Sequence, residues 1–156
     1  MSKVYHLTFT QHINASLDQV WPFFSSPQNL AKITPPDMDF QVISSPSEKV
    51  YAGQVIEYNV KVLPGLSMYW MTEITHVEQL KYFVDEQRFG PYSLWHHQHH
   101  FKEVTGGVLM TDIVHYKIPF WILGDIANTL FVRKQLQKIF DFRTGKVNEL
   151  FKDELV

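Results

Sequence analysis

Two histidines on one face of a predicted strand are the residues best suited to chemistry in this chain. The run from Tyr92 to Phe101 reads as a strand. Because successive side chains in a strand point to opposite faces, Trp95, His97, His99 and Phe101 share one face. Each imidazole carries polar nitrogens that need partners, so a plain packed core has no obvious use for two of them. The pattern therefore predicts a cavity wall that is mostly apolar with a few polar groups.

The sequence leaves three roles open for His97 and His99. They could form hydrogen bonds to a ligand or act as acid and base near neutral pH, they could be held by carboxylates as a structural network, or they could chelate zinc or iron. Asp112 follows across the Gly106-Gly107 turn and could lie close to both. The candidates for catalysis are thus His97, His99 and Asp112. We expect no bound metal, because no His-x-x-x-His on a helix supports one.

Other charged residues near this strand are less informative. Asp112 and Asp85 each alternate with apolar neighbours, so a buried carboxylate there would need an imidazole or arginine partner. Arg133 and Arg143 lie about three turns apart on a predicted late helix. Either could approach the cavity, although a solvated helix face is the default interpretation for both.

The composition excludes several classes of function. The 156 residues carry a formal net charge of -2, and no Lys/Arg-rich block marks a nucleic-acid surface. Cysteine is absent, which excludes disulfides and thiolate chemistry. Neither a signal-peptide pattern nor an apolar run of about 18 residues occurs, so we expect a soluble cytoplasmic protein without stable membrane insertion. Glycine-rich phosphate loops and the Gly-x-Ser-x-Gly elbow are also missing, which disfavours nucleotide and acyl-transfer enzymology.

The periodicity of apolar residues predicts one domain over residues 1–156. The expected strands cover 4–13, 39–43, 54–63, 68–77, 81–87, 93–104 and 108–118, and the expected helices cover 17–24, 27–32 and 121 to about 150, with Gly145 a point where the last could end early. The short links between the later strands predict an antiparallel meander. The long C-terminal helix is the element able to cover a curved sheet. We therefore predict an α+β helix-grip fold with about six to seven strands, two short helices after the first strand, and a space facing Trp95.

The chain resembles the START/Bet v 1-like (SRPBCC) superfamily, and more closely its bacterial polyketide cyclase/dehydrase-like ligand-binding proteins. The resemblance rests on Val20-Trp21-Pro22-Phe23-Phe24, Phe83-Val84-Asp85-Glu86-Gln87, Gly90-Pro91-Tyr92 with Trp95-x-His97-x-His99-x-Phe101, Met110-Thr111-Asp112-x-Val114-x-Tyr116-x-Ile118-Pro119, and Phe131 to Arg143. It implies a cavity for a small hydrophobic or amphipathic molecule. We expect no cofactor. The expected lining residues are Tyr58, Trp70, Glu73, Asp85, Trp95, His97, His99, Phe101, Asp112, Tyr116 and Arg133.

Three functions fit this resemblance. The first is a non-catalytic binder or carrier of a small hydrophobic ligand. The second is a cyclase/dehydratase-type enzyme that acts on a polyketide-like or other carbonyl substrate with a cavity histidine as acid or base. The third is an interaction module that uses the apolar segment from Pro119 to Gly124. A homodimer is a possible assembly. A catalytic histidine would face open cavity volume, whereas a structural one would have both nitrogens bound to protein.

Overall fold

Alternating apolar and polar residues produce seven strands, with helical segments between the first and second strands and after the last one. The computed structural model describes residues 3–44, 47–63, 65–119 and 131–152. The elements are β1 (Tyr5–Ile13), α1 (Leu17–Phe24), η1 (Pro27–Ile33), η2 (Pro36–Met38), β2 (Gln41–Val42), β3 (Gln54–Leu63), β4 (Leu66–Glu78), β5 (Tyr82–Phe89), β6 (Leu94–Val104), β7 (Gly107–Lys117) and α3 (Arg133–Leu150), of which η1 and η2 are 3-10 helices.

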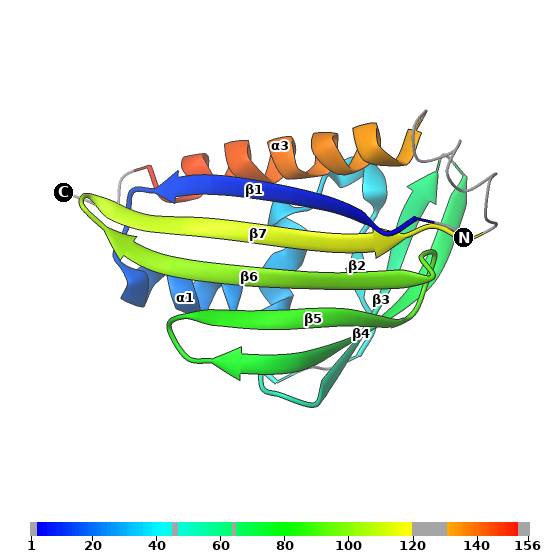
Figure 1. The fold of residues 1–156 in the computed structure, drawn as a ribbon, viewed down its shortest axis with the longest axis horizontal. Helices are drawn as coiled ribbons and strands as arrows, with labels where there is room; N and C mark the ends of the chain where they lie inside the picture. The colour runs from blue at the N-terminus through cyan, green and yellow to red at the C-terminus, as the bar shows by residue number, and fades with distance from the viewer. Residues whose placement is uncertain (1–2, 45–46, 64, 120–130, 153–156) are drawn as a thin grey trace.

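The strands form one antiparallel sheet in the order β1-β7-β6-β5-β4-β3-β2 (Figure 1). Its first and last strands in sequence, β1 and β7, therefore lie side by side. The register of the central strands places Asp85 on β5 opposite His97 on β6, and His99 on β6 opposite Asp112 on β7. Directly opposed residues on one face have their side chains in reach of each other. The meander thus brings two carboxylates and two imidazoles together.

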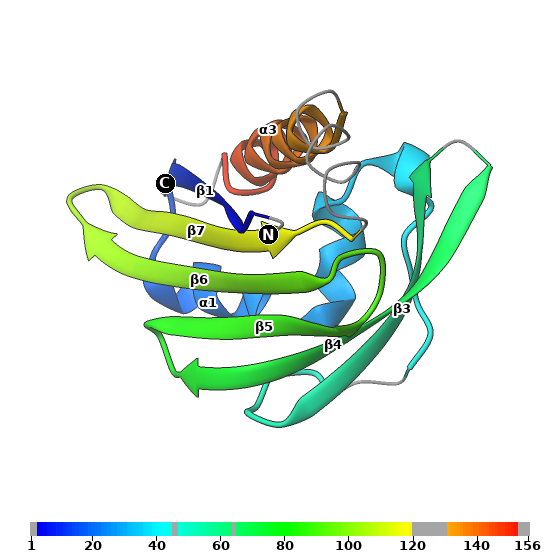
Figure 2. The same ribbon diagram turned by 45° about the vertical axis from the view of Figure 1, so that its right-hand side comes forward.

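The sheet curls around the helical segments, which Figure 2 shows most clearly. Val20 and Trp21 of α1 and Val147 of α3 join one core cluster with the inner face of the sheet. Leu136 and Phe140 of α3 join a second cluster built against β1 and β7. The apolar stripe of α3 thus lies against the concave side of the sheet, as a helix-grip fold requires.

A tight glycine turn joins β6 to β7 and fixes the register between them. Gly106 and Gly107 have φ values of 80° and 150°, which side chains with a Cβ rarely adopt. A Cβ on Gly107 would also collide with the carbonyl oxygen of Ile13 on β1, whereas one on Gly106 would meet open space. Gly107 is therefore needed for two reasons, backbone conformation and the close approach of β1.

The predicted α+β helix-grip fold is confirmed. The second short helix is a 3-10 helix that extends to Ile33, and η2 was not predicted. Helix α3 continues through Gly145 to Leu150, so the early end considered at that glycine is wrong. The predicted start of this helix, residues 121–130, and most of the apolar segment from Pro119 to Gly124 lie outside the described residues. Among the residues that the structure describes, no helix is long and apolar enough to cross a membrane.

Candidate functional site

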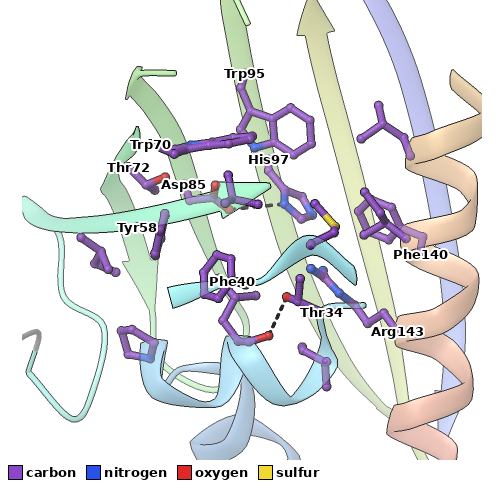
Figure 3. Close-up of a pocket in the computed structure, with 18 of the residues that line it drawn as sticks. Thr34, Phe40, Tyr58, Trp70, Thr72, Asp85, Trp95, His97, Phe140 and Arg143 are labelled. Carbon is purple, nitrogen blue, oxygen red and sulfur yellow. Dashed lines mark hydrogen bonds and ion pairs between the residues drawn. The ribbon is translucent and has the colours of Figure 1, made fainter. Parts of the chain in front are cut away.

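A cavity of about 480 Å³ lies between the sheet and the helical segments (Figure 3). Its wall is largely apolar and combines side chains from α1, η1, β3, β4 and α3 with the inner face of β5 and β6. Six of the residues expected in a ligand site line this cavity: Tyr58, Trp70, Asp85, Trp95, His97 and His99. The predicted face of β6 thus points into this space, with Trp95 and the two histidines on the wall.

Three of the expected lining residues are packed behind the wall instead. Phe101 continues the same face of β6, but its ring packs against Trp21 and Phe24 of α1, which closes the cavity at that end. Tyr116 is fully buried in the core cluster beside β1. Asp112 lies behind the two histidines and is 6% exposed. These positions follow from the helices and β1, which cover part of the face that the strand pattern alone would leave open.

The remaining two expected lining residues face solvent. Glu73 pairs with Arg88 at 2.7 Å, and the side chains are 32% and 41% exposed. Its neighbours on β4, Thr72 and Ile74, point inward, so strand alternation turns Glu73 outward. Arg133 is exposed at the first turn of α3. The structure therefore brings neither of these side chains to the cavity.

Two carboxylates hold both histidines at the wall. The Nε2 of His97 lies 2.9 Å from Oδ1 of Asp112, and its Nδ1 lies 3.4 Å from Oδ2 of Asp85. The Nε2 of His99 lies 2.8 Å from the same Asp85 oxygen. Its Nδ1 lies 2.9 Å from Oδ1 of Asp112, at an angle outside hydrogen-bond geometry. Every ring nitrogen of the pair therefore faces a carboxylate oxygen. We call these four residues the His/Asp cluster.

Arg143 of α3 places a positive charge next to the His/Asp cluster, from the helix side of the cavity. Its guanidinium approaches Asp112, with Nη1 3.9 Å from Oδ1, and lies 4.8 Å from the centre of the Phe140 ring. The side chain is 12% exposed and points into the cavity (Figure 3). The default interpretation of Arg143 as a solvated residue is therefore wrong. Its spacing of three residues from Phe140, a member of the apolar stripe, was the signal that places both on one helix face.

Burial and the carboxylates act in opposite directions on the two histidines. Burial, together with the adjacent His99 ring, lowers the pKa of His97 despite the attraction of Asp85 and Asp112. Burial also opposes protonation of His99, but its contacts with Asp112 and Asp85 outweigh this effect and raise its pKa. Burial alone would raise the pKa of Asp112, yet the hydrogen bond from His97 and the close contact with His99 hold it well below its usual range. With His99 and Arg143 charged, the two carboxylates are balanced.

Asp85, His97 and His99 also have the composition of a metal-ligand set. One ligand atom from each lies within 4.8 Å of the others. Two imidazoles and a carboxylate suit zinc and other first-row transition metals. The cluster can thus act in two ways, as a set of ion pairs or as a site for a cation.

Besides Nδ1 of His99, two buried nitrogens on the cavity wall lack a hydrogen-bond partner among the described residues. They are Nε1 of Trp70 and Nε of Arg143. Both groups are donors whose nitrogens have almost no exposed surface, so an oxygen acceptor on a bound molecule would reach either one only after the side chain rotates. The polar part of the wall is therefore suited to a molecule that accepts hydrogen bonds.

Comparison with solved structures identifies the fold. A putative uncharacterized protein from Rhizobium leguminosarum has 16% sequence identity and a TM-score of 0.66, over 96% of this chain and 97% of its own. Ginseng major latex-like protein 151 from Panax ginseng has 14% identity and a TM-score of 0.69, over 95% and 97%. The protein has the START/Bet v 1-like fold.

A third structure with the START/Bet v 1-like fold of this chain is protein CV1439 from Chromobacterium violaceum. It has 12% identity and a TM-score of 0.71, and the match covers 94% of this chain and 97% of that one. No protein-family model and no curated protein matches the sequence. At these identities the similarity establishes the fold alone, so the function has to be argued from the site.

Proposed function

We propose that this protein binds a small hydrophobic or amphipathic molecule in the cavity between the sheet and α3, as a non-catalytic binder or carrier. The observation that carries the proposal is the cavity itself. Its volume of about 480 Å³ lies within the range of small-molecule sites, roughly 300–1,000 Å³. Aromatic side chains such as Trp70, Trp95 and Phe140 provide an apolar wall against which a ligand loses contact with water.

The polar groups of the cavity favour an amphipathic ligand. The His/Asp cluster and Arg143 lie on the sheet and helix walls that face each other, while η1 and β3 contribute mainly apolar side chains. After a side-chain rotation, the unpartnered N–H groups of Trp70 and Arg143 would donate hydrogen bonds to oxygens of the ligand. A ligand with an apolar body and an oxygen-bearing end therefore fits this wall better than a pure hydrocarbon.

The state of the histidines supports binding over catalysis. A general base needs a nitrogen free to take a proton from the substrate. Each ring nitrogen of His97 and His99 lies within 3.4 Å of a carboxylate oxygen of Asp85 or Asp112. The alternative, a cyclase/dehydratase-type reaction on a carbonyl substrate, would require one of these contacts to break first. It is accordingly the weaker proposal.

The test is a titration with anilinonaphthalene sulfonate, an amphipathic anionic dye that fluoresces in apolar surroundings, in the purified protein and in two variants of β3. Val60 lines the cavity and is buried, whereas Val55 lies on the outer face of the same strand and is 45% exposed. Val60→Trp fills part of the cavity, so we expect it to weaken dye binding at least tenfold. Val55→Trp adds the same side chain outside the cavity, and we expect an affinity within twofold of the parent protein.

Equal dye binding by both variants would contradict a ligand site in this cavity. The natural ligand requires a second measurement, native mass spectrometry of the protein purified from its own host, followed by extraction of small molecules. A co-purifying hydrophobic compound would support the binder proposal and define its chemical class. Turnover of that compound by the purified protein would favour the cyclase/dehydratase alternative instead.

A further inference from the structure

We propose that Asp85, His97 and His99 bind one divalent transition-metal ion at the wall of the cavity. The proposal concerns the protein itself and does not depend on which organic ligand occupies the cavity. It rests on the convergence of three ligand side chains, on a carboxylate behind the histidines, and on the charge of the surrounding residues.

The spacing of the three ligand atoms fits a shared ion. Oδ2 of Asp85 lies 2.8 Å from Nε2 of His99 and 3.4 Å from Nδ1 of His97. Zinc holds nitrogen and oxygen ligands at about 2.0–2.2 Å, so two ligands on one ion are roughly 3.0–3.5 Å apart. All three atoms lie within 4.8 Å of one another. Small side-chain rotations would therefore complete the site, because the pairing of β5 and β6 already places the three side chains next to one another.

Asp112 provides the outer contact that metal-binding histidines usually have. A histidine that binds a metal through one nitrogen commonly donates the other N–H to a carboxylate, which fixes its orientation. Here Oδ1 of Asp112 lies 2.9 Å from Nε2 of His97 and 2.9 Å from Nδ1 of His99. These are the nitrogens that face away from Asp85. Asp112 thus orients His97 by a hydrogen bond and lies against the outer nitrogen of His99, while Asp85 stays on the ligand side.

The charge of the surroundings also favours a cation. With neutral imidazoles, Asp85 and Asp112 contribute two negative charges, and Arg143 contributes one positive charge. Among the described residues Arg143 forms its ion pair with Asp112, with Nη1 3.9 Å from Oδ1, and its charge also acts on Asp85. One negative charge is therefore left next to the two imidazoles. Burial makes that charge costly unless it is balanced, either by a proton on His99 or by a metal cation that takes the place of that proton.

The ligand set selects the class of ion. Two nitrogens and one oxygen suit zinc, cobalt or ferrous iron, whereas calcium and magnesium prefer sites made of oxygen alone. All three residues line the cavity, so the fourth position would face its interior. Water or an oxygen of a bound molecule would occupy that position.

The test uses untagged protein stripped with a chelator and then titrated with Zn²⁺ by equilibrium dialysis and with Co²⁺ by visible absorption. We expect one ion per chain and a Co²⁺ spectrum typical of nitrogen and oxygen ligands. His99→Gln should weaken Zn²⁺ binding at least 100-fold. The matched control is His100→Gln, because His100 lies on the other face of β6 and contacts Gln98. That variant should bind within threefold of the parent protein.

Asp112→Asn provides a graded test, since removal of an outer carboxylate commonly weakens binding roughly 10–100-fold. A parent protein that takes up no stoichiometric Zn²⁺ or Co²⁺ overturns the proposal, whether or not any variant folds, and leaves a cluster balanced by a proton. Equal loss in His99→Gln and His100→Gln would also overturn it. Dye binding in the same samples reports the cavity separately, so loss of metal with retained dye binding rejects the metal site alone.

Discussion

Replacement of Asp112 by alanine should destabilise the protein more than any other single change in the His/Asp cluster. This carboxylate is 6% exposed and lies 2.9 Å from nitrogens of both His97 and His99 and 3.9 Å from Nη1 of Arg143. Its removal leaves three basic groups around the single carboxylate of Asp85. Breaking a buried ion pair by removing one partner typically costs about 3–5 kcal/mol.

That loss is a large part of the stability of a domain of this size, which is typically about 5–15 kcal/mol. With a urea dependence of about 2 kcal/mol per molar, a loss of about 4 kcal/mol lowers the unfolding midpoint by roughly 2 M. The assay is urea unfolding at neutral pH, followed by circular dichroism. Asp112→Asn keeps one acceptor oxygen, and we expect it to lose about half as much, because hydrogen bonds to charged groups contribute roughly 1.5–3 kcal/mol.

The matched control is Thr111→Ala on the same strand. Thr111 precedes Asp112 on β7, and strand alternation turns its side chain to the outer face of the sheet. We expect a change of no more than about 0.5 kcal/mol there. A loss below about 1 kcal/mol in Asp112→Ala would refute the reasoning, because it would mean that the cluster contributes little once the cost of burying its charges is counted.

Two further predictions concern the glycine turn between β6 and β7 and the buried phenol group of Tyr92. Gly107→Ala should lower the free energy of unfolding by about 2–4 kcal/mol, since it combines strain at positive φ with a collision at Ile13. Gly106→Ala should lower it by about 1 kcal/mol, because only the backbone strain applies there. Thermal unfolding of the two variants checks the difference. Burial, with a smaller effect of the neighbouring Tyr116, raises the pKa of Tyr92. The stability that this tyrosine contributes is therefore fully present below about pH 10, where an unfolded tyrosine ionises, and is lost as the pH rises further. Urea unfolding at pH 8 and pH 11 should show a smaller alkaline loss in Tyr92→Phe than in the parent protein, and equal losses would contradict this assignment.

Most of the fold could be predicted because its signals are local. Strand β3 and helix α1 begin and end at the residues that alternation and helical spacing indicate, and the links between β5, β6 and β7 are too short for anything but an antiparallel meander. The short helix after α1 begins at Pro27 and is a 3-10 helix, whose backbone hydrogen bonds join residues three apart. The spacing of apolar residues in so short a segment cannot distinguish it from an α-helix. Gly145 lies mid-helix because packing of Val147 and Phe140 outweighs its weak propensity.

The candidate site could be predicted only in part, because a strand pattern gives the face of a residue and not what covers that face. Parity placed His97 and His99 inward, and the Gly106-Gly107 turn placed Asp112 close to them. It could not show that Phe101 would be covered by the aromatic side chains of α1. Glu73 lies on β4, where the register with β5 shifts at two points. The inward-facing positions of β5 therefore do not reveal which positions of β4 face inward. These outcomes depend on contacts between segments distant in sequence.

The contacts within the His/Asp cluster also bear on how the cavity could choose its ligand. Because both carboxylates already engage both imidazoles, a neutral ligand that enters gains little by competing for them. Its selection would depend on the shape of the aromatic wall and on the N–H groups of Trp70 and Arg143. A metal ion would change this balance, since it would take the imidazole nitrogens that face Asp85 and offer a coordination position to an oxygen of the ligand. The preference of the cavity for oxygen-bearing over purely apolar molecules should therefore increase when Zn²⁺ is present if the metal site exists, and should be independent of Zn²⁺ if it does not.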